Sequence, residues 1–442
     1  MVEYPATLHN NADFLHCAGC ETPLLWESLA NEVRKIFRSR LVPKMIRDRT
    51  EERRMAGFSA STRILVLCTF RVIMRRKLIG SGTPTSKPMD NEEKFKLLKM
   101  LDQLELNELV QALHRIERIE GLLYYYLVTA TLDHFGYDGE MTVRYATRRY
   151  GRWRGEEMRQ AHLALGKEIH METLIRNWDA ASVYLAQDSV QKGYFSPHYV
   201  VHDITLCPVA DVWRERGFYR WGHVYCDEFH QACAGTYHPD GHVVIHQNKM
   251  KGDKICSFHW VMPPRETPCK FDPPTALGIR LAESYQAENE LEGALYALKR
   301  GHRLVGGVYQ AFATQAREDF GAQGLASTWH GLCQWGAERG RIMREAHQEL
   351  GIEPQPANMI RYSDLPCQYV CEIEELEVKP DRYSFRVTKS PIIQSLLDYD
   401  LSDLVEPFYR EVYRAMAATY LPGAKVSLES DNPNEIDLTI ER

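Results

Sequence analysis

Residues 150–162 read YGRWRGEEMRQAH, and residues 335–347 read WGAERGRIMREAH. At this offset of 185 positions, Phe135-Gly136 also aligns with Phe320-Gly321. Matches spread over so long a range indicate that one structural unit occurs twice in the chain. We expect residues shared by both copies to serve the fold. Polar residues present in one copy alone are candidates for chemistry.

The later part of each copy aligns at a smaller offset of 183 positions. There Cys207-Pro208 aligns with Ser390-Pro391, and Ala234–Pro239 aligns with Ala417–Pro422. Both copies also carry two glycines four residues apart, a spacing that would let helices approach closely. These glycines are Gly151, Gly155, Gly336 and Gly340.

Each copy is predicted to combine amphipathic helices with a small antiparallel sheet. We therefore predict an α+β fold, a tandem duplicated unit of helices packed on a small antiparallel sheet, with an extra helical N-terminal region. Pseudo-twofold packing of the copies is expected, as in a homodimer fused into one chain. The predicted segments are a helical N-terminal region (1–115), the catalytic copy (116–265), a connecting segment (266–299) and a degenerate structural copy (300–442).

The hydrophobic periodicity and the turn residues place the individual elements. Helices are predicted over 24–40, 62–76, 91–118, 121–134, 139–166 and 224–234, with a further helix that starts at Pro208. Strands are predicted over 199–204, 242–247, 254–262, 425–429 and 435–440.

The composition is that of a globular protein, with 44% hydrophobic and 26% charged residues among 442. No run of 18 apolar residues occurs, so we expect no membrane span and no membrane partner. The first residues lack the pattern of a signal peptide, and eleven irregularly spaced cysteines favour reduced thiols. These features predict a cytoplasmic protein.

Residues 34–77 carry 14 Lys/Arg against three acidic residues. Such a stretch can contact nucleic acid, an acidic lipid surface or an acidic partner. No nucleic-acid-binding motif accompanies it, so we interpret it as a solvated helix face, or as a face docked on the acidic remainder. Nucleic acid is not an expected partner.

The first copy contains a polar cluster that the second copy lacks. Eight of the 17 histidines lie between positions 198 and 259: His198, His202, His223, His230, His238, His242, His246 and His259. Cys207, Cys226, Cys233 and Cys256 lie in the same window. The counterparts in the second copy are Ser390 for Cys207, Tyr409 for Cys226, Tyr413 for His230, Leu421 for His238, Lys425 for His242, Glu429 for His246 and about Asp437 for Cys256.

This imbalance indicates one working half and one structural half. The alternative is that both halves have drifted and that the histidines are surface polar residues.

Cys207 is predicted to cap a helix whose first residue is Pro208, because proline suits the first helical position. Free backbone N–H groups and the helix dipole would favour a thiolate there, which is what a nucleophile needs. The alternative is that the position is only a cap, as Ser390 would be.

Cys226-Asp227 is predicted to open the next helix, on which Cys226, His230 and Cys233 share one face. A Cys beside a His suits nucleophilic catalysis, because the imidazole can take the thiol proton. A structural thiol is the alternative. We assign Asp227 the role of orienting a histidine.

On the last strand of the first copy, Cys256 and Phe258 share one face, and His259 lies on the other. His242 and His246 share a face of the preceding strand and could meet Cys256 across the sheet, depending on the register of the strands.

Zinc is the alternative to cysteine chemistry. The chain has no HExxH motif and no paired CxxC, and Cys17–Cys20 forms one CxxC without a partner pair. We expect no cofactor. A zinc ion, if bound, would take Cys226, His230 and His238 as ligands.

Several short motifs of the first copy resemble the L-2-amino-thiazoline-4-carboxylic acid hydrolase family. They are the Tyr-Gly-Arg to Arg-Gly helix (150–155), Cys207-Pro208, Cys226-Asp227, Tyr237-His238-Pro239, and the closing Gly252-Asp253 with Cys256 and Phe258. The resemblance covers about 120–265 and repeats faintly over 300–442. It implies a soluble bacterial protein whose relatives open a five-membered cyclic amidine by adding water at its C=N carbon. A recruited relative in specialised metabolism is an equal implication.

We therefore predict a hydrolase acting on a non-peptide C–N or C=N bond of a small polar substrate. Cys207 or Cys226 is the nucleophile, and His230, His238 or His246 serves as acid and base. The predicted substrate contacts are His198, His242, Cys256 and His259. The alternatives are a zinc enzyme built from the first copy, with a metal-bound water as nucleophile, and a non-catalytic small-molecule sensor. The oligomeric state, including a homodimer, stays open.

Overall fold

The computed structural model describes residues 91–180, 190–264, 266–267, 269–365, 369–430 and 432–442. These residues belong to one compact unit, Met89–Arg442. The predicted helices 24–40 and 62–76, the basic stretch 34–77 and the Cys17–Cys20 motif lie outside the described residues.

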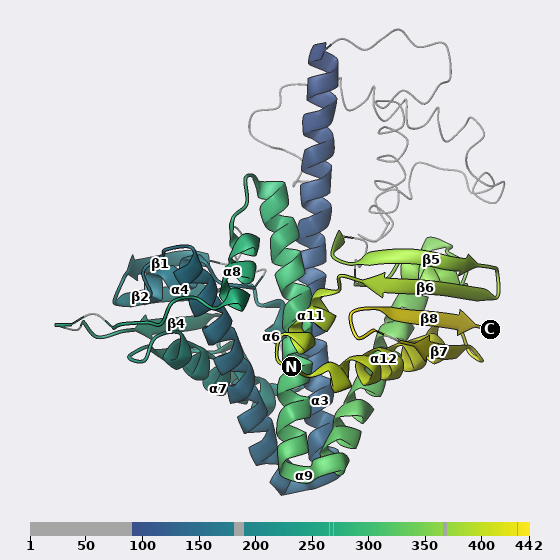
Figure 1. Cartoon of the computed structure of the whole chain (residues 1–442). Coiled ribbons are helices and arrows are strands. Elements are labelled where there is room, and N and C mark those ends of the chain that lie inside the picture. The colour runs from purple at the N-terminus through teal and green to yellow at the C-terminus, as the bar shows by residue number, and fades with distance from the viewer. Residues whose placement is uncertain (1–90, 181–189, 265, 268, 366–368, 431) are drawn as a thin grey trace, which may run out of the picture. The chain divides into compact units, whose positions relative to one another are not determined.

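Two long helices, α3 (Asn91–Ala164) and α9 (Glu290–Leu350), pack along each other in the middle of this unit (Figure 1). Each bends at one glycine, Gly136 with φ 55° and Gly321 with φ 59°, a left-handed conformation that glycine adopts without a steric penalty. The residues just before the bends, Phe135 and Phe320, stack with ring centroids 3.7 Å apart. The pair of residues that revealed the duplication therefore forms a contact between the two copies.

The predicted helices 91–118, 121–134 and 139–166 are parts of α3, which bends only at Gly136. The predicted boundary between residues 115 and 116 falls inside α3, and the predicted start of the second copy at residue 300 falls inside α9. This division of the chain into regions stays a prediction. The shorter helices are α4 (Met171–Arg176), α6 (Pro208–Glu215), α7 (Tyr219–Tyr237), α8 (Ala276–Ala282), α10 (Pro356–Arg361), α11 (Pro391–Leu397) and α12 (Val405–Tyr420). Single 3-10 turns are η4 (Lys249–Lys251), η5 (Glu283–Tyr285) and η7 (Ser402–Leu404).

Within the described residues, two four-stranded antiparallel sheets share one topology, β1-β2-β4-β3 in the first copy and β5-β6-β8-β7 in the second. They lie on either side of the α3–α9 pair (Figure 1). The predicted α+β fold with a tandem duplicated unit is confirmed for this part of the chain. The strands are β1 (Val190–Ser196), β2 (Tyr199–Ile204), β3 (His242–Gln247), β4 (Cys256–Val261), β5 (Glu372–Val378), β6 (Arg382–Thr388), β7 (Lys425–Glu429) and β8 (Ile436–Glu441).

Residues shared by the two copies hold the same contacts in each. Arg154 forms a buried ion pair with Asp179, and Arg339 forms the equivalent pair with Asp364. A second repeated contact joins a histidine ring to a tyrosine hydroxyl, at 2.9 Å for His162–Tyr237 and 2.6 Å for His347–Tyr420. These shared residues stabilise the fold.

The paired glycines let α7 and α12 approach the long helices. A Cβ on Gly155 would lie 2.4 Å from the carbonyl oxygen of Cys233, and one on Gly340 would lie 2.4 Å from that of Met416. Contacts this short exclude any side chain, so these glycines serve helix packing.

Two expectations about individual positions are wrong. Helix α7 begins at Tyr219, so Cys226 and Asp227 lie in its middle and do not open it. The counterpart of Cys256 is Ile436 and not Asp437, because Cys256 pairs with Ile204 and Ile436 pairs with Val387, the residue aligned with Ile204.

No helix in the described ranges is both long and apolar enough to cross a membrane.

Candidate functional site

Three cysteines of the first copy converge from different elements. Cys207 is the half-buried N-cap of α6, Cys226 lies on α7 with 7% of its surface exposed, and Cys256 begins β4 with 3% exposed. Charge on Cys256 raises the pKa of both Cys207 and Cys226, which places the three sulfur atoms within electrostatic range of one another. The fold thus assembles a thiol cluster from residues that lie up to 49 positions apart in the sequence.

The three thiols are protonated at rest, because burial raises the pKa of each above its ordinary value. At Cys207 the N–H of Ala210 and the ammonium of Lys249 act in the opposite direction, but burial outweighs them. The expectation that the helix terminus lowers the pKa of Cys207 is therefore wrong for the unliganded protein, although its position as N-cap is confirmed. Attack by any of these thiols needs a base.

His230 lies one turn after Cys226 on α7. Its Nδ1 lies 2.8 Å from the carbonyl oxygen of Cys226. A carbonyl only accepts, so Nδ1–H donates and Nε2 carries a free lone pair. Burial lowers the pKa of His230 to about 3, with smaller contributions from Arg154 and His202. His230 is consequently a neutral imidazole at physiological pH, and its Nε2 can accept a hydrogen bond.

His202 and Glu117 also face this region, and the predicted site did not include them. His202 lies on β2 opposite Phe258, whose ring contacts His230, and burial lowers the pKa of His202 to about 4. Glu117 on α3 is buried and raises the pKa of Cys207. At the offset of 185 it aligns with His302, so the comparison of copies could have identified it.

Lys249 supplies a buried positive charge beside the thiols. Its Nζ donates to the carbonyl oxygen of Thr205 at 3.0 Å and lies 3.2 Å from a carboxylate oxygen of Asp211. Its backbone N–H donates to Cys256 Sγ at 3.4 Å. The ammonium lowers the pKa of Cys207 and Cys256, so it stabilises negative charge at this site.

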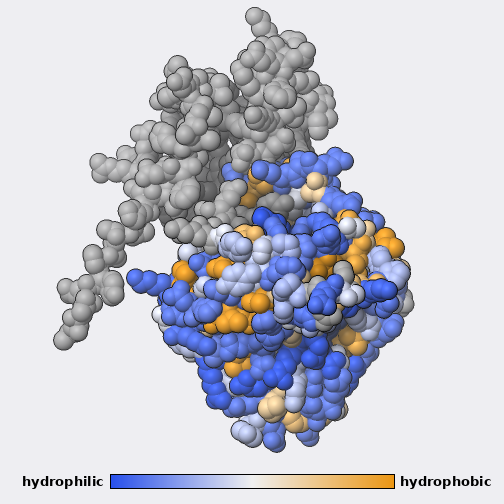
Figure 2. All heavy atoms as spheres, turned by 90° about the vertical axis from the view of Figure 1, so that its left-hand side faces the viewer, coloured by the Kyte–Doolittle hydropathy of each residue, from blue (hydrophilic) through white to orange (hydrophobic). Residues whose placement is uncertain are grey.

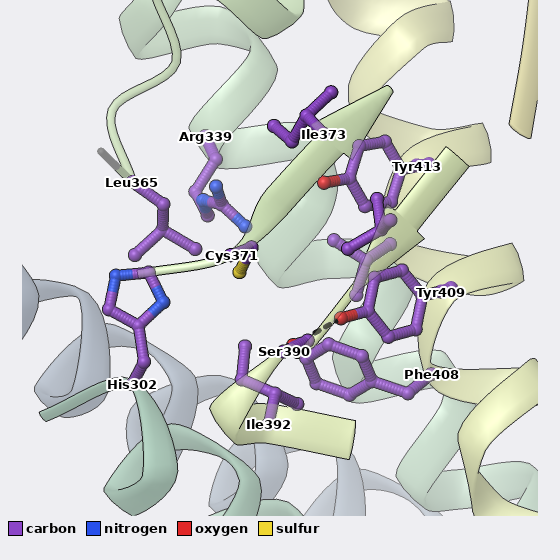
Figure 3. A pocket seen from close by; sticks show the side chains of 12 residues that line it. His302, Arg339, Leu365, Cys371, Ile373, Ser390, Ile392, Phe408, Tyr409 and Tyr413 are labelled. Carbon is purple, nitrogen blue, oxygen red and sulfur yellow. Dashed lines mark hydrogen bonds between the residues drawn. The ribbon is translucent and has the colours of Figure 1, made fainter. Parts of the chain in front are cut away.

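The second copy fills the equivalent space with tyrosines. Ser390 caps α11 and shares a hydrogen bond of 2.8 Å with the Tyr409 hydroxyl, and the rings of Tyr409 and Tyr413 stack (Figure 3). A cavity of about 20 Å³ remains, room for roughly one water molecule. His302 and Arg339 also line this cavity, at the positions of Glu117 and Arg154 in the first copy.

His242 and His246 do not meet Cys256 across the sheet. Val244 pairs with His259, so His242, His246 and His259 share the outer face, whereas Cys256 and Phe258 face the helices. The rings of His246 and His259 lie 3.9 Å apart.

Hydrophobic side chains form patches among hydrophilic ones on the side of the molecule that carries β1–β4 (Figure 2).

The remaining predicted residues do not complete the thiol cluster, although charge on Asp227 raises the pKa of Cys226. Asp227 places a carboxylate oxygen 2.7 Å from Nε2 of His223, a histidine outside the predicted catalytic set, without a hydrogen bond between them. His198 is exposed at the turn between β1 and β2. His238 caps the C-terminus of α7, twelve residues and about 18 Å of helix beyond Cys226.

The described residues contain one group whose ligand atoms lie close enough to hold a metal ion: His238, Asp240 and Cys269, within 4.8 Å of one another. It shares only His238 with the predicted zinc ligands. Nδ1 of His238 accepts the Asp240 backbone N–H at 3.1 Å. A metal bound at Nδ1 would displace this hydrogen bond. A metal bound at Nε2 would require a proton on Nδ1, and a protonated Nδ1 could not accept the Asp240 N–H. The three residues therefore fit a metal ion poorly.

Comparison with known proteins finds a similarity within the first copy. The family model described as L-2-amino-thiazoline-4-carboxylic acid hydrolase matches residues 117–260, which include the three cysteines, His202 and His230. No curated protein and no solved structure matches the chain.

Proposed function

From the match of residues 117–260 to the L-2-amino-thiazoline-4-carboxylic acid hydrolase family model, we propose that the chain is a divergent member of this family and hydrolyses a non-peptide C–N or C=N bond of a small polar substrate. A cyclic amidine with a carboxylate is the substrate class that the family description suggests. The reaction uses a cysteine nucleophile and a histidine base in the first copy.

The observation that supports this proposal most strongly is the contrast between the copies at equivalent positions. The first copy places Cys207, Cys226 and His230 around one region, and the second places Ser390, Tyr409 and Tyr413 there. Tyrosines that bond to a serine and stack fill space, whereas thiols and a neutral imidazole in the same region can react. The first copy is therefore the working half.

In the proposed reaction His230 takes the proton of the thiol, and the sulfur bonds to the amidine carbon. One ring bond at that carbon breaks, and the heteroatom that leaves takes the proton from His230. Water then adds at the same carbon, the cysteine sulfur leaves, and the thiol is restored. The net change is the addition of one water, and no organic cofactor takes part. The need for free thiols favours a reducing, cytoplasmic environment.

The test is direct assay of the purified full chain with 2-amino-thiazoline-4-carboxylate, with product followed by mass spectrometry and free thiol by a colorimetric reagent. We expect ring opening with the gain of one water. Removal of the nucleophile should lower kcat about a thousandfold or more, and His230→Gln should lower it about a hundredfold or more.

Cys207→Ala and Cys226→Ala identify the nucleophile, and Ser390→Ala is the matched control in the second copy. Wild-type rates in both cysteine variants would overturn cysteine catalysis. Absence of turnover for a panel of cyclic amidines, with the protein folded and its thiols reduced, would overturn the substrate class.

A further inference from the structure

The turn that joins β3 to β4 holds a buried amide group with an unused donor. Asn248 is 1% exposed, and its Nδ2 has no hydrogen-bond partner. An unsatisfied buried donor costs roughly 1–3 kcal/mol, so it calls for a ligand or a role. This residue belongs to neither the predicted site nor the reaction described above.

The orientation of this amide is determined by its neighbours. Oδ1 of Asn248 accepts from the backbone N–H of Met250 at 2.8 Å, and the backbone N–H of Asn248 donates to Asp253 at 2.7 Å. Oδ1 must be the acceptor, so the amide cannot be flipped, and Nδ2 is the atom that points inward. Gly252 completes the turn with φ 97°, which glycine adopts without strain.

The turn packs against α7 one helical turn before Cys226, because a Cβ on Gly222 would lie 2.7 Å from Cε of Met250. From this position the Asn248 amide lowers the pKa of the Cys226 thiol. The geometry does not reach a full hydrogen bond while Cys226 is a neutral thiol. A thiolate is a far stronger acceptor than a thiol, and hydrogen bonds to charged groups are the stronger class. The next residue of the same turn, Lys249, directs its backbone N–H at Cys256.

We propose that Asn248 is the hydrogen-bond donor that stabilises the thiolate of Cys226, and that Cys226 is therefore the nucleophile. The assignment of Cys226, and not Cys207, as the nucleophile rests on the proposed function. The assignment of Asn248 as a hydrogen-bond donor to Cys226 does not. When His230 removes the proton of Cys226, the negative charge on sulfur completes the hydrogen bond to Nδ2. The donor thus contributes most when the thiolate forms, which is when catalysis needs it.

The substitution that isolates the donor is Asn248→Asp. Aspartate keeps the oxygen that accepts from Met250 and has nearly the same shape, but it loses the N–H donor and places negative charge beside the sulfur. Asn289→Asp is the matched control, because Asn289 caps α9 in the same way, through its Oδ1 and the N–H of Glu292 at 2.9 Å. Asn248→Ser, which retains a capping hydroxyl without added charge, separates loss of the donor from repulsion.

The readout needs no substrate. Methyl methanethiosulfonate labels the full chain at pH 8, and peptide mass spectrometry gives the rate at each cysteine, with Cys333 of the second copy as internal reference. We expect labelling of Cys226 relative to Cys333 to fall at least tenfold in Asn248→Asp and severalfold in Asn248→Ser. Asn289→Asp should leave it unchanged, and far-ultraviolet circular dichroism reports that each variant is folded.

An unchanged Cys226 rate in folded Asn248→Asp would overturn the proposal, and so would a fall confined to Cys207. The two proposals fail separately. Loss of Cys226 reactivity in the variant, with no hydrolysis by the wild type, would leave the donor assignment and remove the hydrolase. Hydrolysis by the wild type, with kcat and Cys226 reactivity unchanged in Asn248→Asp, would do the opposite.

Discussion

Ser390 and Tyr409 share a hydrogen bond of 2.8 Å at the positions that Cys207 and Cys226 occupy in the first copy. In the second copy the two hydroxyls satisfy each other in a buried setting. Two thiols hydrogen-bond weakly, so the same geometry in the first copy leaves both sulfur atoms available for chemistry. One scaffold therefore supports a closed interior in one copy and a reactive one in the other.

The second copy should matter for stability and not for catalysis. Tyr409→Phe removes one hydroxyl and leaves Ser390 with one partner fewer, so the free energy of unfolding should fall by about 1–3 kcal/mol. The rate of hydrolysis at a temperature well below unfolding should stay within twofold of wild type. Urea unfolding and steady-state assays check the two parts. A loss of activity comparable to that of the Cys226 variant would place chemistry in the second copy.

The rate should be insensitive to pH in the range where an ordinary histidine titrates. Burial lowers the pKa of His230 to about 3, so the imidazole is already a free base at pH 5. We expect kcat/KM to show no acid limb with a midpoint near 6.5 when measured between pH 5 and 8. A limb at that pH in the wild type that disappears in His230→Gln would contradict the depressed pKa.

Stability should fall as the pH is lowered below about 6.5. Burial lowers the pKa of His162 and of His302 to about 3, whereas both titrate near 6.5 in the unfolded chain. Between these values the unfolded chain binds more protons, so acid favours unfolding. Each histidine contributes about 1.4 kcal/mol per pH unit in that window. Urea unfolding at pH 7, 6 and 5 measures the slope, and His302→Gln should reduce it. A slope that His302→Gln leaves unchanged would show that His302 does not titrate in this way.

The buried ion pair between Arg154 and Asp179 should be sensitive to loss of one partner. Both side chains are less than a tenth exposed, and a lone buried charge costs about 3–5 kcal/mol. Asp179→Asn should lower the free energy of unfolding by that amount. The control is Glu345→Gln, which breaks an exposed pair with Arg341 and should cost about 0.5 kcal/mol or less. Equal effects of the two substitutions would contradict the structural role of Arg154–Asp179.

Two glycines of the first copy should respond oppositely to alanine. A Cβ on Gly155 would lie 2.4 Å from the Cys233 carbonyl oxygen, so Gly155→Ala must push α7 away and lower the melting temperature by several degrees. A Cβ on Gly235, within α7, meets nothing closer than 3.6 Å. Gly235→Ala should therefore be neutral or stabilising by up to about 1 kcal/mol. Differential scanning calorimetry of both variants tests the packing, and an undisturbed Gly155→Ala would refute it.

Predictions from the sequence succeeded where a local pattern decides the structure. Strand β3 has the predicted bounds, His242–Gln247, and α6 starts at Pro208 with Cys207 as its cap. The strand predictions omitted β1, β5 and β6, because β1 and β5 are edge strands with polar sequences such as EIEELEV and carry little hydrophobic alternation. Within the site, the duplication pointed to Cys207, Cys226 and His230, and it would also have pointed to Glu117 had the earlier helix been compared.

The histidines of the outer sheet face show why the rest could not be predicted. Alternation along each strand correctly placed Cys256 and His259 on opposite faces, but the pairing between strands sets which faces coincide. Val244 pairs with His259, and this register removes His242 and His246 from the thiols. His238 likewise lies at the far end of α7 because that helix continues to Tyr237.

By itself the sequence determined that the chain contains one unit twice and that the second copy has no thiol or imidazole at the positions of Cys207, Cys226 and His230, because a duplication carries its own comparison. Tertiary structure alone decided which of those groups meet. Cys207, Cys226 and Cys256 come from a helix cap, a helix middle and a strand, and only the packing of α6 and α7 on the sheet brings their sulfur atoms together. The same packing buries Asn248 with an Nδ2 that has no hydrogen-bond partner, a feature that no local pattern encodes.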